Sequence, residues 1–371
     1  MDLTNIAKEF KLDGVIAEVS EYGTGHIHST YKVTTIESSS PDYILQRIND
    51  RIFPKVEELT DNIIRITEHI RSVLRSRYSD DEIEKHVVEV IRTQEQKGFY
   101  KDKQRGDYWR VFKLIKGAKT IDVLENKYQA KAMGKALGEF QELMLDLPLP
   151  RLSDTIPDFH NTAFRIDKLK KSIDEDPLNR YSEVRNEAEY LIGFEKEMKS
   201  FLKNTEDGAL PIRYVHQDVK LSNVLFDEND AILCLIDLDT VMSGHFFYDF
   251  GDAIRGGMNT GAEDEEDITK VSLNLDLFKA FAAGYIQASK SFITRNEVET
   301  LVFGAKIMTY EQAIRFIDDY LNGDIYYNVT HPKHNLIRAK SQVAYFKDIL
   351  LHLNEMDQYV KDLFKTVIGT E

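Results

Sequence analysis

The chain has 371 residues, of which 42% are hydrophobic and 30% are charged, and its formal net charge at pH 7 is −15. This length allows two or three domains, and this composition is typical of a globular, soluble protein. The acidic excess argues against non-specific binding to nucleic acid or to an anionic membrane. Cys234 is the single cysteine, which excludes an internal disulfide and a cysteine zinc site. Inside the apolar run 232–236 it is expected to be a buried strand residue.

The N-terminus gives no targeting signal. Residues 1–4 lack the basic and then apolar pattern of a signal peptide. No apolar run approaches the ~20 residues of a membrane span. We therefore expect a cytoplasmic protein that does not bind membranes, and a monomer is the default expectation.

The first third of the chain predicts three strands, one helix and then two more strands. The expected strands are 16–22, 29–36, 43–48, 86–93 and 107–115, and the expected helix is 54–74. The helix has an apolar stripe that includes Ile63, Ile66 and Ile70. Pro54 suits its first position, where a missing N–H costs nothing.

Helices dominate the remainder. The expected helices are 129–145, 183–202, 273–289, 295–321 and 335–363. Between residues 212 and 238, short apolar strands alternate with polar loops. We therefore place an N-terminal nucleotide-binding lobe at residues 1–115 and a C-terminal catalytic and substrate-binding lobe at 116–371.

The segment 216–223 carries the strongest chemical signal. It reads H-x-D-x-x-x-x-N, and Asp237 follows fourteen residues after Asn223. Asp218 is suited to accept or orient the proton of a hydroxyl. Asn223 and Asp237 offer the oxygen ligands that magnesium prefers. Lys220 is placed to reach a moving phosphate, and together these groups indicate phosphoryl transfer from ATP to a hydroxyl.

Two further motif residues have less specific roles. His216 is expected to brace the loop rather than to transfer protons. Asp239 is either a second metal ligand or an acid that caps the loop.

A glycine pair and a cation in the first strands indicate a nucleotide site. Gly23, Thr24 and Gly25 lie between two expected strands, where glycines let backbone N–H groups approach phosphates, although an ordinary hairpin turn fits them as well. Arg47 shares a strand face with Leu45, an arrangement that suits a cation beside an apolar wall for adenine. A solvated surface arginine is the alternative.

The partner of Arg47 and the adenine contact complete the expected nucleotide site. The acids of the 54–74 helix that could anchor Arg47 are Glu57, Glu58, Asp61 and Glu68. Backbone groups near Phe112 and Leu114, where the last predicted strand leads into the helical part, could meet an adenine edge.

With these motifs the chain resembles the aminoglycoside phosphotransferase/choline kinase branch of the protein-kinase-like superfamily. Gln217 stands where many members have glycine in H-G-D. Residues 235–244, 248–255, 156–162 and 308–316 resemble more specifically the N-acetylhexosamine 1-kinases, as do Tyr326-Tyr327 and residues 334–336.

This resemblance implies an α+β, bilobal protein-kinase-like fold. It consists of a small antiparallel β-sheet lobe with one helix and a larger, mostly helical lobe. The implied reaction uses ATP and Mg²⁺ to phosphorylate the anomeric C1 hydroxyl of GlcNAc or GalNAc, so the expected partners are ATP and a small sugar.

The implied sugar site needs polar side chains that bind hydroxyls. The candidates are His160, Asn161, Asp252, Tyr310, Arg315, Tyr320 and His334. Asp249 and Arg255 are expected to form an internal pair that holds the metal loop.

Two other functions remain open on the sequence. The acidic run 263–267 fits a cationic acceptor, so a kinase for an aminoglycoside, choline or another amine-bearing alcohol is one alternative, although a solvated loop is the simpler interpretation of that run. A pseudokinase without turnover is the other. Its support is Arg47 where kinases usually have lysine, together with the short glycine pattern.

Overall fold

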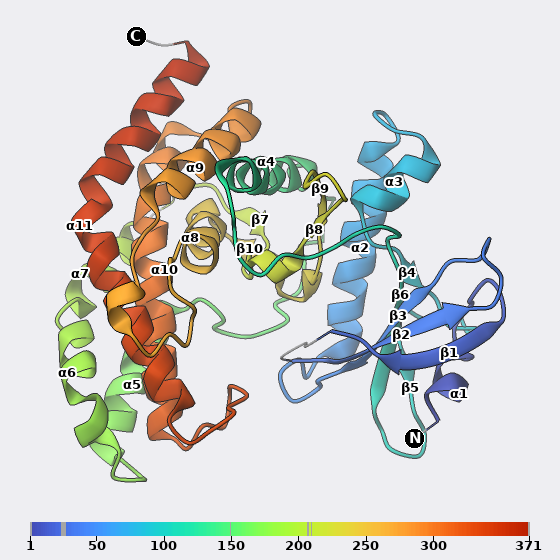
Figure 1. Cartoon of the computed structure of the whole chain (residues 1–371), viewed down its shortest axis with the longest axis horizontal. Helices are drawn as coiled ribbons and strands as arrows, with labels where there is room; N and C mark the ends of the chain where they lie inside the picture. Colours follow the sequence, from blue (N-terminus) through green and yellow to red (C-terminus); the bar gives the residue numbers. More distant parts are fainter. Residues whose placement is uncertain (1, 24–26, 149, 206–207, 209, 370–371) are drawn as a thin grey trace. The chain divides into compact units, whose positions relative to one another are not determined.

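The computed structural model describes residues 2–23, 27–148, 150–205, 208 and 210–369 (Figure 1). The chain forms two compact units. The first contains Met1–Thr120, Leu143–Pro157 and Leu225–Met242, and the second contains Ile121–Glu142, Asp158–Val224 and Ser243–Glu371. The first unit therefore includes two later segments that a single boundary after residue 115 would assign to the other part.

An antiparallel sheet forms the centre of the first unit. Its strands are β1 (Ile16–Glu21), β2 (Ser29–Thr35), β3 (Tyr43–Ile48), β4 (Val90–Ile91), β5 (Tyr100–Lys101) and β6 (Tyr108–Lys113). Their order is β1-β2-β3-β6-β4, and β5 pairs with β6. The first three strands lie within a residue of their predicted bounds.

A short helix, α1 (Leu3–Ala7), closes one face of this sheet. Phe10, which follows α1, is buried with Leu45 of β3 and Trp109 of β6 in one apolar cluster. Burying a side chain of this size contributes about 1.5–3 kcal/mol. A helix of five residues is too short for a periodic signal, which explains why the sequence did not predict it.

Two more helices belong to the first unit, α2 (Val56–Leu74) and α3 (Asp80–His86). For the first 115 residues the sequence predicted one helix, whereas the described part of this segment contains three, α1, α2 and α3. Helix α3 begins where Glu82 accepts hydrogen bonds from the N–H and hydroxyl of Ser79, at 3.3 and 3.0 Å. The predicted strand 86–93 is partly correct, because α3 includes His86 and the strand covers only Val90–Ile91.

The second unit is mostly helical, as predicted. Its helices are α4 (Lys127–Leu143), α5 (Thr162–Glu175), α6 (Tyr181–Ile192), α7 (Glu195–Asn204), α8 (Phe246–Gly257), α9 (Leu275–Ser289), α10 (Arg295–Leu321) and α11 (His334–Ile368). The predicted helix 183–202 is two helices, α6 and α7, and the sequence did not predict α5 or α8. The strand β7 (Arg213–Val215) pairs with β10 (Met242–Gly244), and β8 (Val224–Phe226) pairs with β9 (Ile232–Leu235) in a second short ribbon, which lies almost entirely in the Leu225–Met242 segment of the first unit.

Helix α10 is the centre of this unit and contacts α5, α6, α8 and α11. It begins with a capping box, in which Thr294 accepts from the N–H of Glu297 at 3.2 Å and Glu297 accepts from the N–H of Thr294 at 2.8 Å. Two glycines let α10 approach α8 at backbone distance. A Cβ on Gly304 would lie 2.0 Å from the carbonyl oxygen of Phe247, and one on Gly251 would lie 2.2 Å from the backbone of Gly304. These glycines therefore fix the position of α8.

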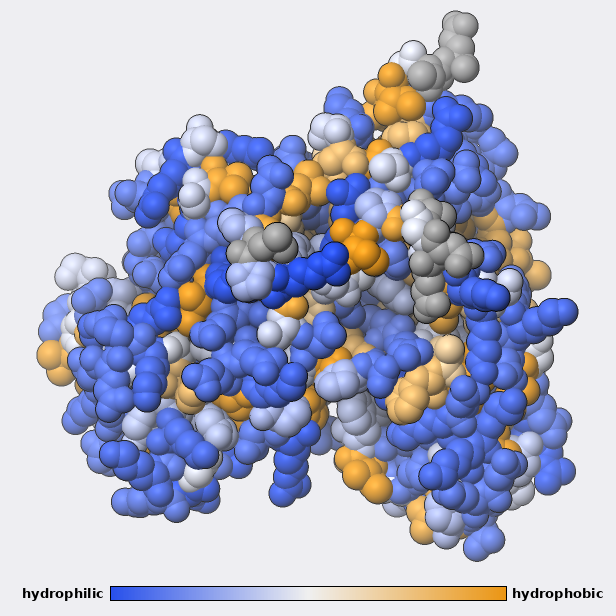
Figure 2. All heavy atoms as spheres, turned by 180° about the vertical axis from the view of Figure 1, so that it is seen from behind, coloured by the Kyte–Doolittle hydropathy of each residue, from blue (hydrophilic) through white to orange (hydrophobic). Residues whose placement is uncertain are grey.

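Hydrophilic residues predominate on the face that Figure 2 shows, with apolar residues in scattered groups. Such scattered groups are normal for protein surfaces. Among the described helices, none combines the length and the hydropathy needed to cross a lipid bilayer.

Candidate active site

Three side chains of the predicted motif meet in the second unit. After β7 the chain forms a loop and then a 3-10 turn, η2 (Leu221–Asn223). Oδ2 of Asp218 accepts hydrogen bonds from Nζ of Lys220 at 2.8 Å and from Nδ2 of Asn223 at 2.9 Å. The same amide nitrogen of Asn223 donates to the main-chain oxygen of Asp218, also at 2.9 Å. The loop therefore closes on itself around Asp218.

Lys220 sets the protonation of Asp218. Burial by itself would raise the pKa of Asp218, but the charge and hydrogen bond of Lys220, together with the charges of His216 and Arg255, hold this pKa below its ordinary value. Asp218 is therefore a carboxylate at neutral pH, as a proton acceptor must be.

Asp249 of α8 holds the backbone of this loop. Its carboxylate is fully buried and accepts the N–H groups of His216 and Gln217 at 3.0 and 2.8 Å. Gln217 has a φ of +65°, a left-handed conformation that costs a non-glycine residue about 1–2 kcal/mol. A glycine at position 217, as in the H-G-D motif of the family that the sequence resembles, would avoid this cost. The bonds to Asp249 stabilise the strained backbone.

The predicted pair between Asp249 and Arg255 is wrong. The other partner of Asp249 is Gln141, whose Nε2 donates to it at 3.0 Å. Arg255 instead binds Asp252 at 2.8 Å and Glu263 at 3.0 Å. Asp249 therefore binds the backbone of the loop, whereas Arg255 binds Asp252 and Glu263.

His160 connects the start of α5 to the catalytic loop. Its Nδ1 lies 2.7 Å from Oε1 of Glu311, and its Nε2 lies 2.9 Å from the carbonyl oxygen of Gln217. Both ring nitrogens of His160 therefore face oxygen atoms of the protein. Burial would raise the pKa of Glu311, but the charge of His160 and its hydrogen bond hold this pKa below its ordinary value.

Arg315 shares Glu311 with His160, at 4.0 Å. Its guanidinium lies over three aromatic rings, those of Phe159, Tyr326 and Tyr327, with centroid distances of 5.4, 5.5 and 5.7 Å. Planar guanidinium groups stack well on such rings while their N–H edges remain able to donate. His160 and Arg315 are thus the two predicted sugar ligands that the structure brings together around one acid.

Four of the other predicted sugar ligands have roles in the fold. Tyr310 and Tyr320 are buried in a hydrophobic cluster of the second unit, where they pack against other core side chains. Asn161 is the N-cap of α5, where its Oδ1 accepts from the N–H of Phe164 at 3.0 Å. His334 lies at the start of α11, where its Nε2 lies 3.0 Å from Oδ2 of Asp264.

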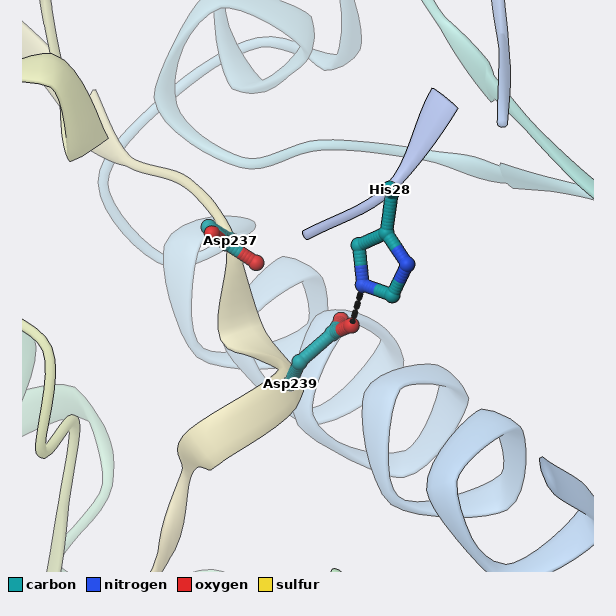
Figure 3. A group of neighbouring side chains, drawn as sticks. All are labelled: His28, Asp237 and Asp239. Carbon is teal, nitrogen blue, oxygen red and sulfur yellow. Dashed lines mark hydrogen bonds and ion pairs between the residues drawn. The ribbon is translucent and has the colours of Figure 1, made fainter. Parts of the chain in front are cut away.

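In the first unit, Asp239 is the centre of a buried ionic group (Figure 3). Arg110 of β6 donates to both carboxylate oxygens, at 2.6 and 2.9 Å, and His28 lies 2.7 Å from Oδ2. Nδ1 of His28 accepts the N–H of Asn49 at 3.1 Å. This bond fixes the tautomer, so Nε2 of His28 carries a proton and donates to Asp239.

These contacts favour the second role considered for Asp239, an acid that holds the loop. Both of its oxygens and both ring nitrogens of His28 have hydrogen-bond partners in the protein. Burial would raise the pKa of Asp239, but Arg110 and His28 hold this pKa far below its ordinary value. Asp239 therefore anchors the 3-10 turn η3 (Leu238–Thr240) to the sheet.

Asp237 stands immediately before η3 and is the remaining metal-ligand candidate of this unit. It is half-buried, with a φ of +62°. One of its carboxylate oxygens lies within 4.8 Å of the facing atoms of His28 and Asp239 (Figure 3). Its left-handed backbone is tolerated best by Asn, Asp and Gly, which suits an aspartate at the turn.

The predicted surroundings of Arg47 are wrong. Nη2 of Arg47 lies 3.0 Å from Oδ1 of Asp107 rather than next to an acid of α2. Leu45, on the same strand face, is fully buried in the cluster beneath α1, so it is not an open wall for adenine. The opposite face carries Gln46, which accepts from Nε of Arg110 at 3.0 Å.

Arg110 and His28 are the residues that sequence reasoning missed. Arg110 stands between Trp109 and Val111, which are both fully buried. A charge within an apolar strand was the available signal, because a buried charge requires a partner. Its partner, Asp239, lies 129 residues away and no local pattern identifies it.

The other predicted nucleotide contacts are Phe112, Leu114 and the glycine segment 23–25. The N–H of Leu114 donates to the carbonyl oxygen of Asp42 at 2.9 Å, so this N–H is not available to an adenine edge. Phe112 pairs with Ile44 in the sheet. Gly23 has a φ of +71° and open space around it. Thr24 and Gly25 lie outside the described residues.

The combination of this sheet, this helical unit and this loop defines a class of protein. The model of the phosphotransferase enzyme family matches residues 18–288. The chain belongs to this family, and the transfer of a phosphoryl group is its class of reaction.

Solved structures agree on the fold. An aminoglycoside phosphotransferase from Alicyclobacillus acidocaldarius matches with a TM-score of 0.57 and 13% identity, covering 96% of both chains. An amicoumacin kinase in complex with AMP-PNP, Ca²⁺ and its ligand matches with a TM-score of 0.56 and 13% identity, covering 97% of this chain and 92% of that one. A spectinomycin phosphotransferase in complex with ADP and spectinomycin matches at 0.52 and 15%, covering 97% of both.

Proposed function

We propose that the protein is an ATP- and magnesium-dependent kinase that phosphorylates the anomeric C1 hydroxyl of an N-acetylhexosamine, GlcNAc or GalNAc. Membership of the phosphotransferase enzyme family supports the reaction class. The observation that carries the proposal is the ionised Asp218, held by Lys220 and Asn223. The resemblance of residues 235–255 and 308–316 to hexosamine 1-kinases supports the acceptor.

Asp218 is the proposed base. Lys220 and Asn223 both donate to Oδ2, so Oδ1 is the oxygen that would accept the proton of the C1 hydroxyl. A general base acts at a distance of about 2.6–3.2 Å from the atom that it deprotonates. The closed loop keeps the carboxylate in one orientation, and orientation is a major part of catalysis in phosphoryl transfer.

Asn223 and Asp237 are the proposed magnesium ligands. The amide nitrogen of Asn223 donates to Asp218, so its oxygen Oδ1 is the atom directed to a cation. Asp237 adds a carboxylate, and both oxygen types fit the preference of Mg²⁺. Bound magnesium would neutralise charge on the transferring phosphate. Asp239, fixed by Arg110 and His28, holds the turn that presents Asp237.

The charges of the second unit favour a neutral acceptor. Glu311 is compensated by His160 and Arg315, and Asp252 by Arg255. A cationic acceptor needs a carboxylate that has no cationic partner. Arg315 is a donor, and donors suit hydroxyl and amide oxygens such as those of an acetamido sugar.

An amine-bearing alcohol is the second candidate. Its support is the chemistry named for proteins of similar fold. These are the spectinomycin phosphotransferase, the amicoumacin kinase and an ethanolamine kinase from Plasmodium vivax, which matches with a TM-score of 0.51 and 13% identity. The acidic run 263–267 was its support in the sequence. However, Glu263 binds Arg255 and Asp264 binds His334, which weakens that support.

An acceptor panel tests the proposal. We expect ATP- and Mg²⁺-dependent ADP formation with GlcNAc or GalNAc, and phosphorus NMR of the product should show a sugar 1-phosphate. Kanamycin, spectinomycin, ethanolamine and choline should give at least about 100-fold lower kcat/KM, because the buried acids already have partners. Turnover only with the amines would reject the sugar assignment. ATP binding without ADP formation for any acceptor would indicate a pseudokinase.

A further inference from the structure

One face of α8 follows the catalytic loop along its length. Asp249, Asp252 and Gly256 are spaced three and four residues apart, so they lie on the same side of the helix. Asp249 binds the N–H groups of His216 and Gln217. At the other end, a Cβ on Gly256 would lie 3.7 Å from Cα of Lys220. Asp252 is between these two contacts and therefore faces the part of the loop that contains Asp218.

The carboxylate of Asp252 is buried and only half used. The residue is 3% exposed. Its Oδ1 accepts from Nε of Arg255 at 2.8 Å. Within the described ranges, no hydrogen-bond donor is found for its Oδ2. Most buried polar atoms in folded proteins have such a partner, so a buried carboxylate oxygen without one indicates a place for a donor from a ligand.

The charge balance around Asp252 restricts what this ligand is. Arg255 binds Asp252 at 2.8 Å and Glu263 at 3.0 Å, and Arg338 lies 3.9 Å from Glu263, so two cations balance the two acids and Asp252 is neutralised. The positive charge of Arg255 is among those that lower the pKa of Asp218, so the Asp252–Arg255 pair lies close to the base. A neutral pair with one open acceptor atom suits a hydroxyl, whereas an ammonium group or a metal ion needs an uncompensated charge.

We propose that Oδ2 of Asp252 binds a second hydroxyl of the acceptor, beside the hydroxyl that Asp218 deprotonates. The inference rests on the proposed phosphotransfer and deepens it, because it requires an acceptor with at least two hydroxyl groups. Arg255 orients the carboxylate. Alcohols with a single hydroxyl, such as choline and ethanolamine, lack the group that Asp252 binds.

Monodeoxy acceptors test this on the unaltered enzyme. With GlcNAc and its 3-, 4- and 6-deoxy analogues, we expect one analogue to lose about 10–100-fold in kcat/KM, the range for a hydrogen bond to a charged group. The other two should stay within about 3-fold. Equal kcat/KM for all three analogues and GlcNAc overturns the proposal, and so does efficient turnover of choline or ethanolamine.

The variant Asp252→Asn identifies the residue that binds this hydroxyl. The amide oxygen must accept from Arg255, so the NH₂ group replaces the acceptor atom that faces the hydroxyl. In the variant we expect kcat/KM for GlcNAc to fall about 10–100-fold with the KM for ATP unchanged. Replacing GlcNAc by the sensitive deoxy analogue should then lower kcat/KM of the variant by no more than about 3-fold. If the loss from the variant and the loss from the deoxy analogue multiply, another residue binds the hydroxyl.

A matched control and a binding measurement complete the test. Asp318 is also a buried helical carboxylate of the second unit, bonded to Lys168 and Ser172, so Asp318→Asn should keep the wild-type deoxy pattern. If no acceptor is phosphorylated, the proposed function fails. In that case calorimetry with GlcNAc tests Asp252 alone, and equal affinity of the wild type and Asp252→Asn contradicts the inference.

Discussion

At the scale of single residues, the protonation of Asp218 depends on a balance between burial and the nearby cations. Burial favours the neutral acid, and the charge of Lys220 at 2.8 Å, helped by His216 and Arg255, favours the carboxylate. The net effect lowers the pKa of Asp218, so the base is ionised at neutral pH. The same side chain that we expect to reach the phosphate therefore also keeps the base active.

The variant Lys220→Met separates these effects. Burial remains while the compensating charge is lost, so the pKa of Asp218 should rise above the wild-type value. A base is active only when ionised, so the acid limb of kcat/KM should move to higher pH in the variant. The check is a pH–rate profile at saturating ATP, with the exposed Lys171→Met as the control. An unchanged acid limb would contradict the role of Lys220.

The sequence predicted the residues of the catalytic loop because they are close together in the chain. Asp218, Lys220 and Asn223 lie within six residues, and local geometry alone brings them into contact. The sugar candidates are spread from residue 160 to 334, so only tertiary packing decides which of them meet. Tyr310 and Tyr320 belong to α10, which is buried on most of its sides, and there the sequence does not distinguish a core aromatic residue from one that contacts a ligand.

At the scale of secondary-structure elements, α8 connects the core to the catalytic loop. Gly304 of α10 allows the close approach that fixes α8, and α8 carries Asp249, which holds the loop. The packing of these two helices therefore determines the orientation of the backbone beside Asp218.

Gly304→Ala should weaken this connection. Its new methyl group would lie 2.0 Å from the carbonyl oxygen of Phe247, so the helices must separate. We expect a loss of about 1–3 kcal/mol in the free energy of unfolding, although alanine favours a helix by about 1 kcal/mol over glycine. Urea unfolding measures this change, and activity should fall with it. Gly256→Ala, whose methyl group would have 3.7 Å of space, is the control for stability; equal stability of both variants would contradict the packing argument.

Strand prediction succeeded in the first unit for β1 to β3, where segments rich in β-branched, aromatic and apolar residues are separated by turn residues. At 86–93, where β-branched residues indicated a strand, only Val90–Ile91 forms one. The capping interaction of Ser79 with Glu82 starts α3, which ends at His86. Helix α8 escaped prediction because its segment contains Gly251, Gly256 and Gly257, which lower helix propensity.

At the scale of the whole molecule, the reaction class and the acceptor rest on different kinds of evidence. The reaction class follows from a contiguous motif and from the family match over residues 18–288. The acceptor follows from dispersed side chains, so its assignment depends on experiment.

The most direct test of the central claim is turnover by Asp218→Asn. Asparagine keeps the shape of the side chain but cannot act as the base. We expect kcat with GlcNAc or GalNAc to fall about 10²–10⁴-fold, while the affinity for ATP, measured by calorimetry, stays within about 3-fold of the wild type. Turnover at the wild-type rate in this variant would contradict the assignment of Asp218 as the catalytic base.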